Sequence, residues 1–264
     1  ESFDKALLNY RFNDAAQVAY THVWGKFCDW YVEFSKPFLS QDNSIVRQET
    51  RQTMAWALDQ CLIILHPIMP FITEELWESI CAREEMLVTW NWPEYSIRDL
   101  ENKSADTEIE WVISLIEQIR SVRSELRVPA GAKVPLIQMK LERDYQKIIH
   151  RNKILIERLA RVNVISEGFT NSDGIISITV EGGEFALYIS EFVDISVEKT
   201  RLLKTLEKNN EECLLLRNKL ANEKFVSKAP QEVINETRSR LNELDQNVVK
   251  LSSALQRLEG TNSK

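Results

Sequence analysis

Two heptad runs near the C-terminal end constrain the fold of this chain more than any other feature. Residues recur at alternating steps of four and three from 195 to 220, and again from 234 to 258. Such spacing places one apolar stripe along each helix and is typical of a coiled coil. The first stripe consists of Ile195, Lys199, Leu202, Leu206, Asn209, Cys213, Leu216 and Leu220, and the second of Ile234, Thr237, Leu241, Leu244, Val248, Leu251, Leu255 and Leu258.

A short polar segment, NEKFVSKAPQ, separates the two runs. It contains Pro230, which suits the first turn of the second helix because proline fixes a helical φ and its missing N–H is not needed there. Closing a short loop costs less entropy than recruiting a partner chain. We therefore expect the runs to pair within one monomeric chain as an antiparallel hairpin.

The first 128 residues have the pattern of a four-helix bundle. Only 7 Gly and 7 Pro occur among 264 residues, and this composition favours long helices. Apolar residues at helical spacing predict helices over 13–36, Ser44–Leu65, FITEELWESI after Pro70, and Ala105–Arg127. Pro37 and the pair His66-Pro67 are expected to end the first two. A loop rich in aromatics, Met86–Glu101, precedes the fourth.

Residues 129–194 have a different character. After the stop Val128-Pro129-Ala130-Gly131, VPLIQMKL predicts a strand, 144–161 a helix, and VNVIS, GIISITV and EFALYI three short strands. A turn at Glu181-Gly182-Gly183 joins the last two. We predict a mainly α chain with a small α+β module: a helical bundle domain at 1–128, the module at 129–194, and a coiled-coil arm at 195–264.

The distribution of charge separates the arm from the body. The formal net charge is −7, which argues against indiscriminate electrostatic binding of nucleic acid. However, residues 201–264 contain 12 Lys and Arg against 9 Asp and Glu, whereas residues 1–200 carry a net charge of −10. A local basic surface on the arm can bind phosphates despite the negative total.

The sequence contains no pattern that points to catalysis or metal binding. The four cysteines, Cys28, Cys61, Cys81 and Cys213, form no close pair, so neither a zinc site nor a disulfide framework is indicated. No nucleophile, base and orienting acid converge recognisably, which makes a hydrolase the weakest hypothesis. No apolar run approaches the roughly 20 residues of a membrane span. We expect a cytoplasmic location with reduced thiols.

Three stretches of the sequence are distinctive: YRFNDAAQVAYTHVWGKFCDWYVEFSKP at 10–37, LHPIMPFITEELW at 65–77, and NEKFVSKAPQEVINETRSRL at 222–241. All three resemble valyl-tRNA synthetases. The second also occurs in the isoleucyl and leucyl enzymes, so the FCDWY and KFVSKAP runs select the valyl family. With IRSVRSELRVPAG between them, the resemblance covers nearly the whole chain and is looser over Ile175–Ile189. A first helix without a start signal agrees with a piece of a longer protein.

The resemblance implies the C-terminal, tRNA-binding part of such an enzyme. The HIGH-like and KMSKS-like motifs that bind ATP in this class do not occur in the sequence, and no Gly-rich phosphate loop replaces them. We therefore expect no catalytic residue, no metal and no cofactor in this chain, and no activity of the chain alone. The full-length parent would use ATP and magnesium, and the expected partner is valine tRNA rather than DNA or a membrane.

Basic residues in the predicted bundle are candidates for anticodon binding: Arg11, Lys36, Arg120, Arg123 and Arg127. Arg120 and Arg123 lie one turn apart and so share a helix face. The alternative is a solvated face paired with Glu117 or Glu125. Aromatic residues of the first helix could stack on bases, but their helical spacing favours a place in the core for Trp24, Phe27 and Tyr31.

The arm carries a second set of candidates, which the resemblance assigns to the elbow of the tRNA: Arg217, Lys219, Lys224, Lys228, Arg238 and Arg240. The alternative is that they are ordinary polar positions of a coiled coil. Phe225 and Val226 are expected to close the hinge. A structural or interaction protein that docks a partner on the hairpin is the competing function.

Overall fold

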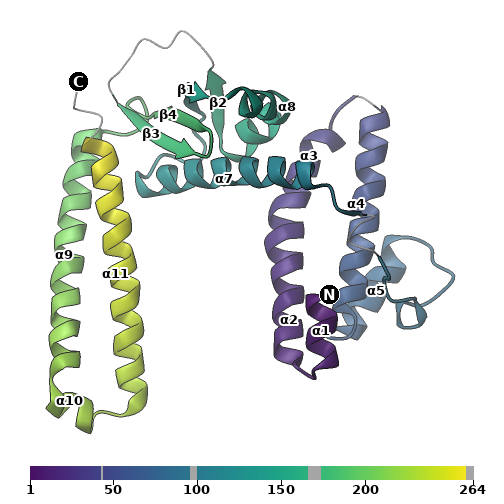
Figure 1. The fold of residues 1–264 in the computed structure, drawn as a ribbon, viewed down its shortest axis with the longest axis horizontal. Coiled ribbons are helices and arrows are strands. Elements are labelled where there is room, and N and C mark those ends of the chain that lie inside the picture. Colours follow the sequence, from purple (N-terminus) through teal and green to yellow (C-terminus); the bar gives the residue numbers. More distant parts are fainter. Residues whose placement is uncertain (43, 96–99, 166–173, 260–264) are drawn as a thin grey trace. The chain divides into compact units, whose positions relative to one another are not determined.

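The computed structural model of the chain describes residues 1–42, 44–95, 100–165 and 174–259 (Figure 1). The described chain forms two compact units, Glu1–Lys103 and Ser104–Lys264, referred to below as unit 1 and unit 2. The predicted division into domains at 1–128, 129–194 and 195–264 stays a prediction. Residues 96–99 of the predicted aromatic loop, Ser166 of a predicted strand, and 260–264 of the predicted arm lie outside the described residues.

Unit 1 is helical. Its elements are α1 (Ser2–Leu8), α2 (Phe12–Tyr20), the π-helix η1 (Thr21–Val32), α3 (Glu33–Leu39), α4 (Ser44–Leu65), α5 (Pro70–Ile80) and the 3₁₀ turn η2 (Leu87–Thr89). One core cluster joins Phe3, Ala6, Ala15 and Ala19 to Ile64 and Leu65, and another joins Leu62, Ile63, Trp77 and Leu87. The end of α4 therefore contributes to both cores, and its bounds are those predicted from the sequence.

The first predicted helix is continuous but not regular. Over Thr21–Val32 its backbone has π-helical geometry, which adds residues to each turn and rotates the side chains relative to a 3.6-residue period. Trp24, predicted to be in the core, is 58% exposed as a result. Phe27 and Tyr31 are half-buried, and their rings are stacked with centroids 5.7 Å apart. The predicted end at Pro37 is also wrong. The helix continues to Leu39 with Pro37 buried inside it, because proline has a helical φ and removes only one donor.

Unit 2 contains a four-stranded sheet with the order β2-β1-β4-β3. The strands of the sheet are β1 (Val134–Leu141), β2 (Val162–Ile165), β3 (Ile175–Val180) and β4 (Gly183–Tyr188), and helix α8 (Arg143–Leu159) connects β1 to β2. β1 and β2 are parallel, with Val134 opposite Val162, and both other pairs are antiparallel. Gly182, with φ of 64°, makes the β3–β4 turn where a Cβ would lie 2.0 Å from the ring of Tyr145. The predicted α+β module is therefore confirmed.

Helix α7 (Lys103–Glu125) was expected to be the fourth helix of the bundle, but it packs within unit 2. The indole N–H of Trp111 donates to the carbonyl of Glu181 at 2.8 Å, and its ring lies 5.2 Å from that of Tyr145 and 6.4 Å from that of Phe185. The apolar stripe of α7 was predicted correctly. Its period shows that one face is buried, but it does not show which element buries it.

The arm is the predicted antiparallel hairpin (Figure 1). Helix α9 (Ile195–Ala221) and α11 (Gln231–Glu259) run side by side, and the short α10 (Glu223–Lys228) lies at the turn. Every residue of both heptad stripes is buried or half-buried. Asp194 caps α9 by accepting from the backbone N–H groups of Ser196 and Val197, and the hydrogen bond from the Ser196 side chain lowers the pKa of its carboxyl group. Among the described helices, none combines the length and the apolar character needed to cross a bilayer.

Candidate nucleic-acid interface

The five predicted anticodon residues divide between the two units. Arg11 and Lys36 belong to unit 1, where both are exposed and both are ion-paired one helical turn away, with Asp14 and Glu33 respectively. Arg120, Arg123 and Arg127 belong to unit 2. The five residues therefore do not belong to a single compact unit.

Arg123 is a structural residue rather than an exposed cation. It is 7% exposed, and its guanidinium donates to the carbonyls of Arg161 at 3.0 Å, Pro129 at 3.0 Å and Ala132 at 2.9 Å. Burial lowers its pKa, with a smaller contribution from the charge of Arg161. These three bonds tie the loop after α7 to the end of α8, so the phosphate-binding role expected for Arg123 has no support in its surroundings.

The other two arginines lie at the same junction. The Nε–H of Arg120 donates at 2.9 Å to the carbonyl of Leu159, which is the last residue of α8, where positive charge is favourable. Arg123 binds the carbonyl of Arg161, two residues beyond that helix. Arg127 lies two residues past the end of α7 and has a φ of 52°. Its side chain is exposed, and the N–H of Val128 donates to the carbonyl of Arg123 at 2.9 Å.

The end of α7 also fixes the base of the hairpin. Arg257 of α11 donates to the carboxylate of Glu125 at 2.5 Å, and Arg201 of α9 donates to the backbone carbonyl of Glu125 at 3.2 Å. Arg201 is itself held by Glu198, which is 6% exposed. Both helices of the arm are therefore tied to one residue of α7, whose carboxylate was predicted as a partner for Arg120 or Arg123.

The six arm candidates fall into two groups. Arg217 is paired with Asp245 at 2.7 Å and Arg240 with Glu212 at 3.0 Å, across the two helices, while the ammonium of Lys219 lies 4.7 Å from the ring centre of the half-buried Phe225. Those three residues stabilise the hairpin. The remaining three are exposed and form no ion pair within the described part of the chain: Lys224, Lys228 and Arg238.

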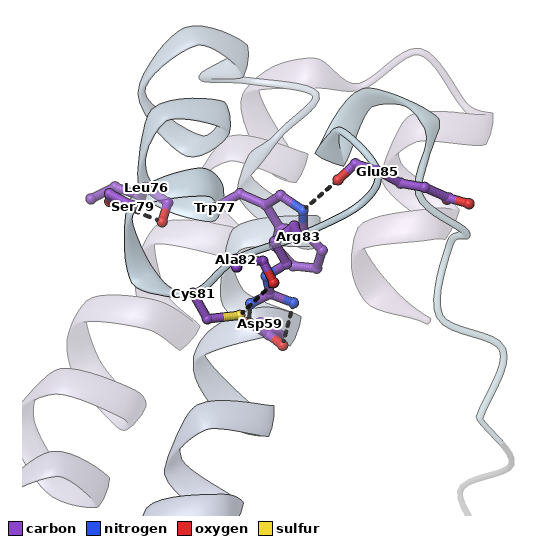
Figure 2. Close-up of polar contacts among 8 residues, drawn as sticks. All are labelled: Asp59, Leu76, Trp77, Ser79, Cys81, Ala82, Arg83 and Glu85. Carbon is purple, nitrogen blue, oxygen red and sulfur yellow. Dashed lines mark hydrogen bonds and ion pairs between the residues drawn. The ribbon is translucent and has the colours of Figure 1, made fainter.

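A half-buried polar cluster in unit 1 was not predicted from the sequence (Figure 2). Arg83 makes a bidentate pair with Asp59 at 2.6 and 3.1 Å, and its guanidinium carbon lies 3.7 Å from the ring centre of Trp77. The indole N–H of Trp77 donates to the carbonyl of Glu85 at 3.2 Å. The pKa of Arg83 is raised, first by the hydrogen bond to Asp59. Together these contacts hold the loop after α5 against α4.

Replacing Arg83 with lysine is expected to destabilise the chain by about 1 to 2 kcal/mol, because an ammonium can neither pair bidentately nor lie flat on an indole. The free energy of unfolding in urea, followed by tryptophan fluorescence, measures the effect. Arg11→Lys is the matched control, since its pair with Asp14 is exposed and should change stability by less than about 0.5 kcal/mol. Equal changes for the two variants would contradict a structural role for the cluster.

The outer face of α4 carries a surface that the sequence analysis missed. Arg47, Gln48, Arg51 and Gln52 are exposed and line a hollow of about 450 Å³. The sequence does contain a pattern that indicates this surface: the dipeptide Arg-Gln is repeated after four residues, which places like side chains one helical turn apart. One further turn along lies Trp56, 42% exposed, whose ring meets that of Tyr95 with centroids 5.8 Å apart.

Cysteines and acidic residues are the described side chains that could act as nucleophiles or hold a metal ion. Burial raises the pKa of the Cys61 thiol to about 11, which keeps it protonated at neutral pH. Within residues 1–42, 44–95, 100–165 and 174–259, no three residues among His, Cys, Asp and Glu lie close enough together to hold a metal ion.

Comparison with known proteins identifies two family models that match in order along the chain. The anticodon-binding domain of tRNA ligase matches residues 1–138, and the valyl tRNA synthetase tRNA binding arm matches residues 194–259. Similar curated proteins include the valine–tRNA ligases of Cereibacter sphaeroides and Ruegeria pomeroyi, each 48% identical over 98% of the chain, and that of Caulobacter vibrioides, 39% identical over 96%. The chain spans about a quarter of their length, namely 26%, 25% and 28%.

Proposed function

Since the chain belongs to the family of anticodon-binding domains of tRNA ligases, we propose that it is the tRNA-binding portion of a valine–tRNA ligase. One observation carries this proposal: the match to the valyl tRNA synthetase tRNA binding arm, at residues 194–259, falls on a hairpin with three exposed cations that form no ion pair among the described residues. Two of them lie in α10 at the turn and the third lies in α11. In the proposal, unit 1 contacts the anticodon and the hairpin contacts the tRNA elbow. The whole enzyme would join valine to its tRNA in the cytoplasm, with ATP and magnesium.

The physical basis of the proposal is local charge on an acidic chain. RNA phosphates attract Lys and Arg over short distances even when the protein is negative overall, since salt screens charges more than about 8 to 10 Å apart. Contacts far from the reacting ester can still improve catalysis, because binding energy used to orient the tRNA brings its acceptor end to the active site. This chain would supply that orientation and, alone, no aminoacylation.

The competing function is an interaction protein that docks a partner on the hairpin. One observation favours it: a hollow of about 520 Å³ on α9 is partly lined by Leu203 and Leu214, which are 48% and 60% exposed. Exposed leucines on a coiled coil are suited to protein contact. This function predicts no preference among tRNAs.

The decisive experiment is filter binding of the chain to valine tRNA at several salt concentrations, with anticodon-changed tRNAs as comparison. We expect binding that weakens steeply with salt and that depends on the anticodon. The chain should also fail to form valyl-tRNA from valine and ATP. No binding at low salt would count against the proposal. Equal binding of valine tRNA and of every tRNA with a changed anticodon would also count against it.

A further inference from the structure

Four polar side chains on the outer face of α4 form two parallel pairs. Arg47 and Arg51 lie one turn apart, as do Gln48 and Gln52 beside them, and all four are exposed. Together they line the hollow of about 450 Å³. With Trp56, one turn beyond Gln52, they are called the α4 array below. Gln48, Gln52 and Trp56 follow one stripe of the helix because each is four residues from the next.

The two arginines differ from the other described arginines of unit 1, Arg11 and Arg83, in what surrounds them. Arg11 and Arg83 each have a carboxylate partner, as does Lys36. Within the described residues of unit 1, neither Arg47 nor Arg51 has an acidic group within ion-pair distance. Like charges four residues apart destabilise a helix. An arrangement that opposes helix stability is understandable if an anion binds between the two guanidinium groups.

The aromatic end of the array is also exposed to solvent. Trp56 donates from its indole N–H to the hydroxyl of Tyr95 at 3.4 Å, and the two rings meet at 65°. Tyr95 is 53% exposed. Large aromatic rings held in one orientation yet open to solvent can stack on unpaired bases, and such stacking does not depend on which base is present.

We propose that the α4 array is the surface of unit 1 that binds unpaired nucleotides of the anticodon loop. Arg47 and Arg51 contact phosphates, the amides of Gln48 and Gln52 hydrogen-bond to base edges, and Trp56 stacks on a base. The inference rests on the proposed function and makes it specific. It also moves the anticodon contact away from Arg11 and Lys36, whose charges are already neutralised within their own helices.

The first test removes the charges. Arg47→Ala combined with Arg51→Ala is expected to weaken binding of valine tRNA about tenfold or more in 0.1 M salt and to reduce the slope of log K against log salt by about 1.4, or 0.7 per phosphate of a single strand. The control, Arg11→Ala combined with Lys36→Ala, removes the same formal charge from unit 1 and should change affinity by less than about twofold. A loss no larger than that of the control would overturn the proposal.

The second test addresses base recognition. Gln48→Ala combined with Gln52→Ala should leave the salt slope unchanged and reduce the preference for the valine anticodon over changed anticodons. Trp56→Ala should weaken binding at least about fivefold, and Trp56→Phe should restore most of it, because a phenyl ring also stacks. Circular dichroism verifies that each variant is folded. Unchanged anticodon preference in the glutamine variant and unchanged affinity in Trp56→Ala would overturn the assignment.

The two proposals fail in different ways. If the unmodified chain does not bind valine tRNA even in dilute salt, the proposed function is wrong. If it binds with anticodon preference and the α4 array variants bind equally well, only the location of the contact is wrong. In that second case, variants of Arg11 and Lys36 that lose affinity would return the site to the residues predicted from the sequence.

Discussion

Replacing Lys224, Lys228 and Arg238 together with alanine will weaken binding of valine tRNA by roughly a hundredfold in 0.1 M salt. Each phosphate contact contributes a slope of about 0.9 to the dependence of log K on log salt, so three lost contacts should also lower the measured slope by about 2 to 3. These three side chains can reach phosphates because they are exposed and form no ion pair within the described part of the chain. Filter binding between 0.05 and 0.2 M salt measures both quantities.

The matched control removes three cations that already form contacts within the hairpin. Arg217, Arg240 and Lys219 lie against Asp245, Glu212 and the ring of Phe225, so their replacement by alanine changes the formal charge equally but removes fewer groups that are free to meet RNA. We expect at least a tenfold smaller loss of affinity. If the two triple variants lose affinity equally, the hairpin attracts RNA through its overall electrostatic field and not through contacts of Lys224, Lys228 and Arg238.

The elements that periodicity could predict are those in which one regular helix buries one face. The heptad stripes around Leu202 and Leu244 are buried as expected, and α4 begins and ends at the predicted residues, Ser44 and Leu65. The β3–β4 turn was predicted from the glycine pair at 182 and 183, since the first of them needs a positive φ. In these cases the local sequence alone determines the local structure.

Where the period changes or a partner is distant, the sequence was insufficient. The π-helical segment Thr21–Val32 alters the number of residues per turn, so a 3.6-residue period placed Trp24 in the core although it is exposed. The buried stripe of α7 was evident, but Trp111 finds its partners at Tyr145 and Glu181, tens of residues away. Only the three-dimensional arrangement determines which element covers such a stripe.

The candidate sites show the same limit for charged residues. A sequence lists cations without their partners, and an exposed Lys228 cannot be distinguished from a paired Arg217 until the facing helix is placed. Arg83 was not among the residues predicted from the sequence, and its partner Asp59 is 24 residues earlier in the chain. The repeated Arg-Gln pair of α4 was detectable, but its spacing alone does not indicate that both arginines have no carboxylate partner among the described residues.

Arg123→Met is expected to destabilise unit 2 by about 3 kcal/mol or more. Methionine fills a similar volume but cannot donate, so the carbonyls of Arg161, Pro129 and Ala132 would lose a charged donor inside the protein. In a unit of this size, 3 kcal/mol corresponds to a fall in melting temperature of roughly 6 to 12 °C. Thermal and urea unfolding followed by circular dichroism measure the change.

The control for this variant is Arg127→Met, four residues away and just past the end of the same helix. The Arg127 side chain is exposed and should contribute less than about 0.5 kcal/mol to the free energy of unfolding. Because Glu125 between them holds both Arg201 and Arg257 at the base of the arm, loosening the end of α7 should also weaken tRNA binding near the new melting temperature. Well below it, the folded variant should bind as tightly as the unmodified chain. An affinity lost at every temperature, with stability unchanged, would instead make Arg123 a tRNA contact as the sequence predicted.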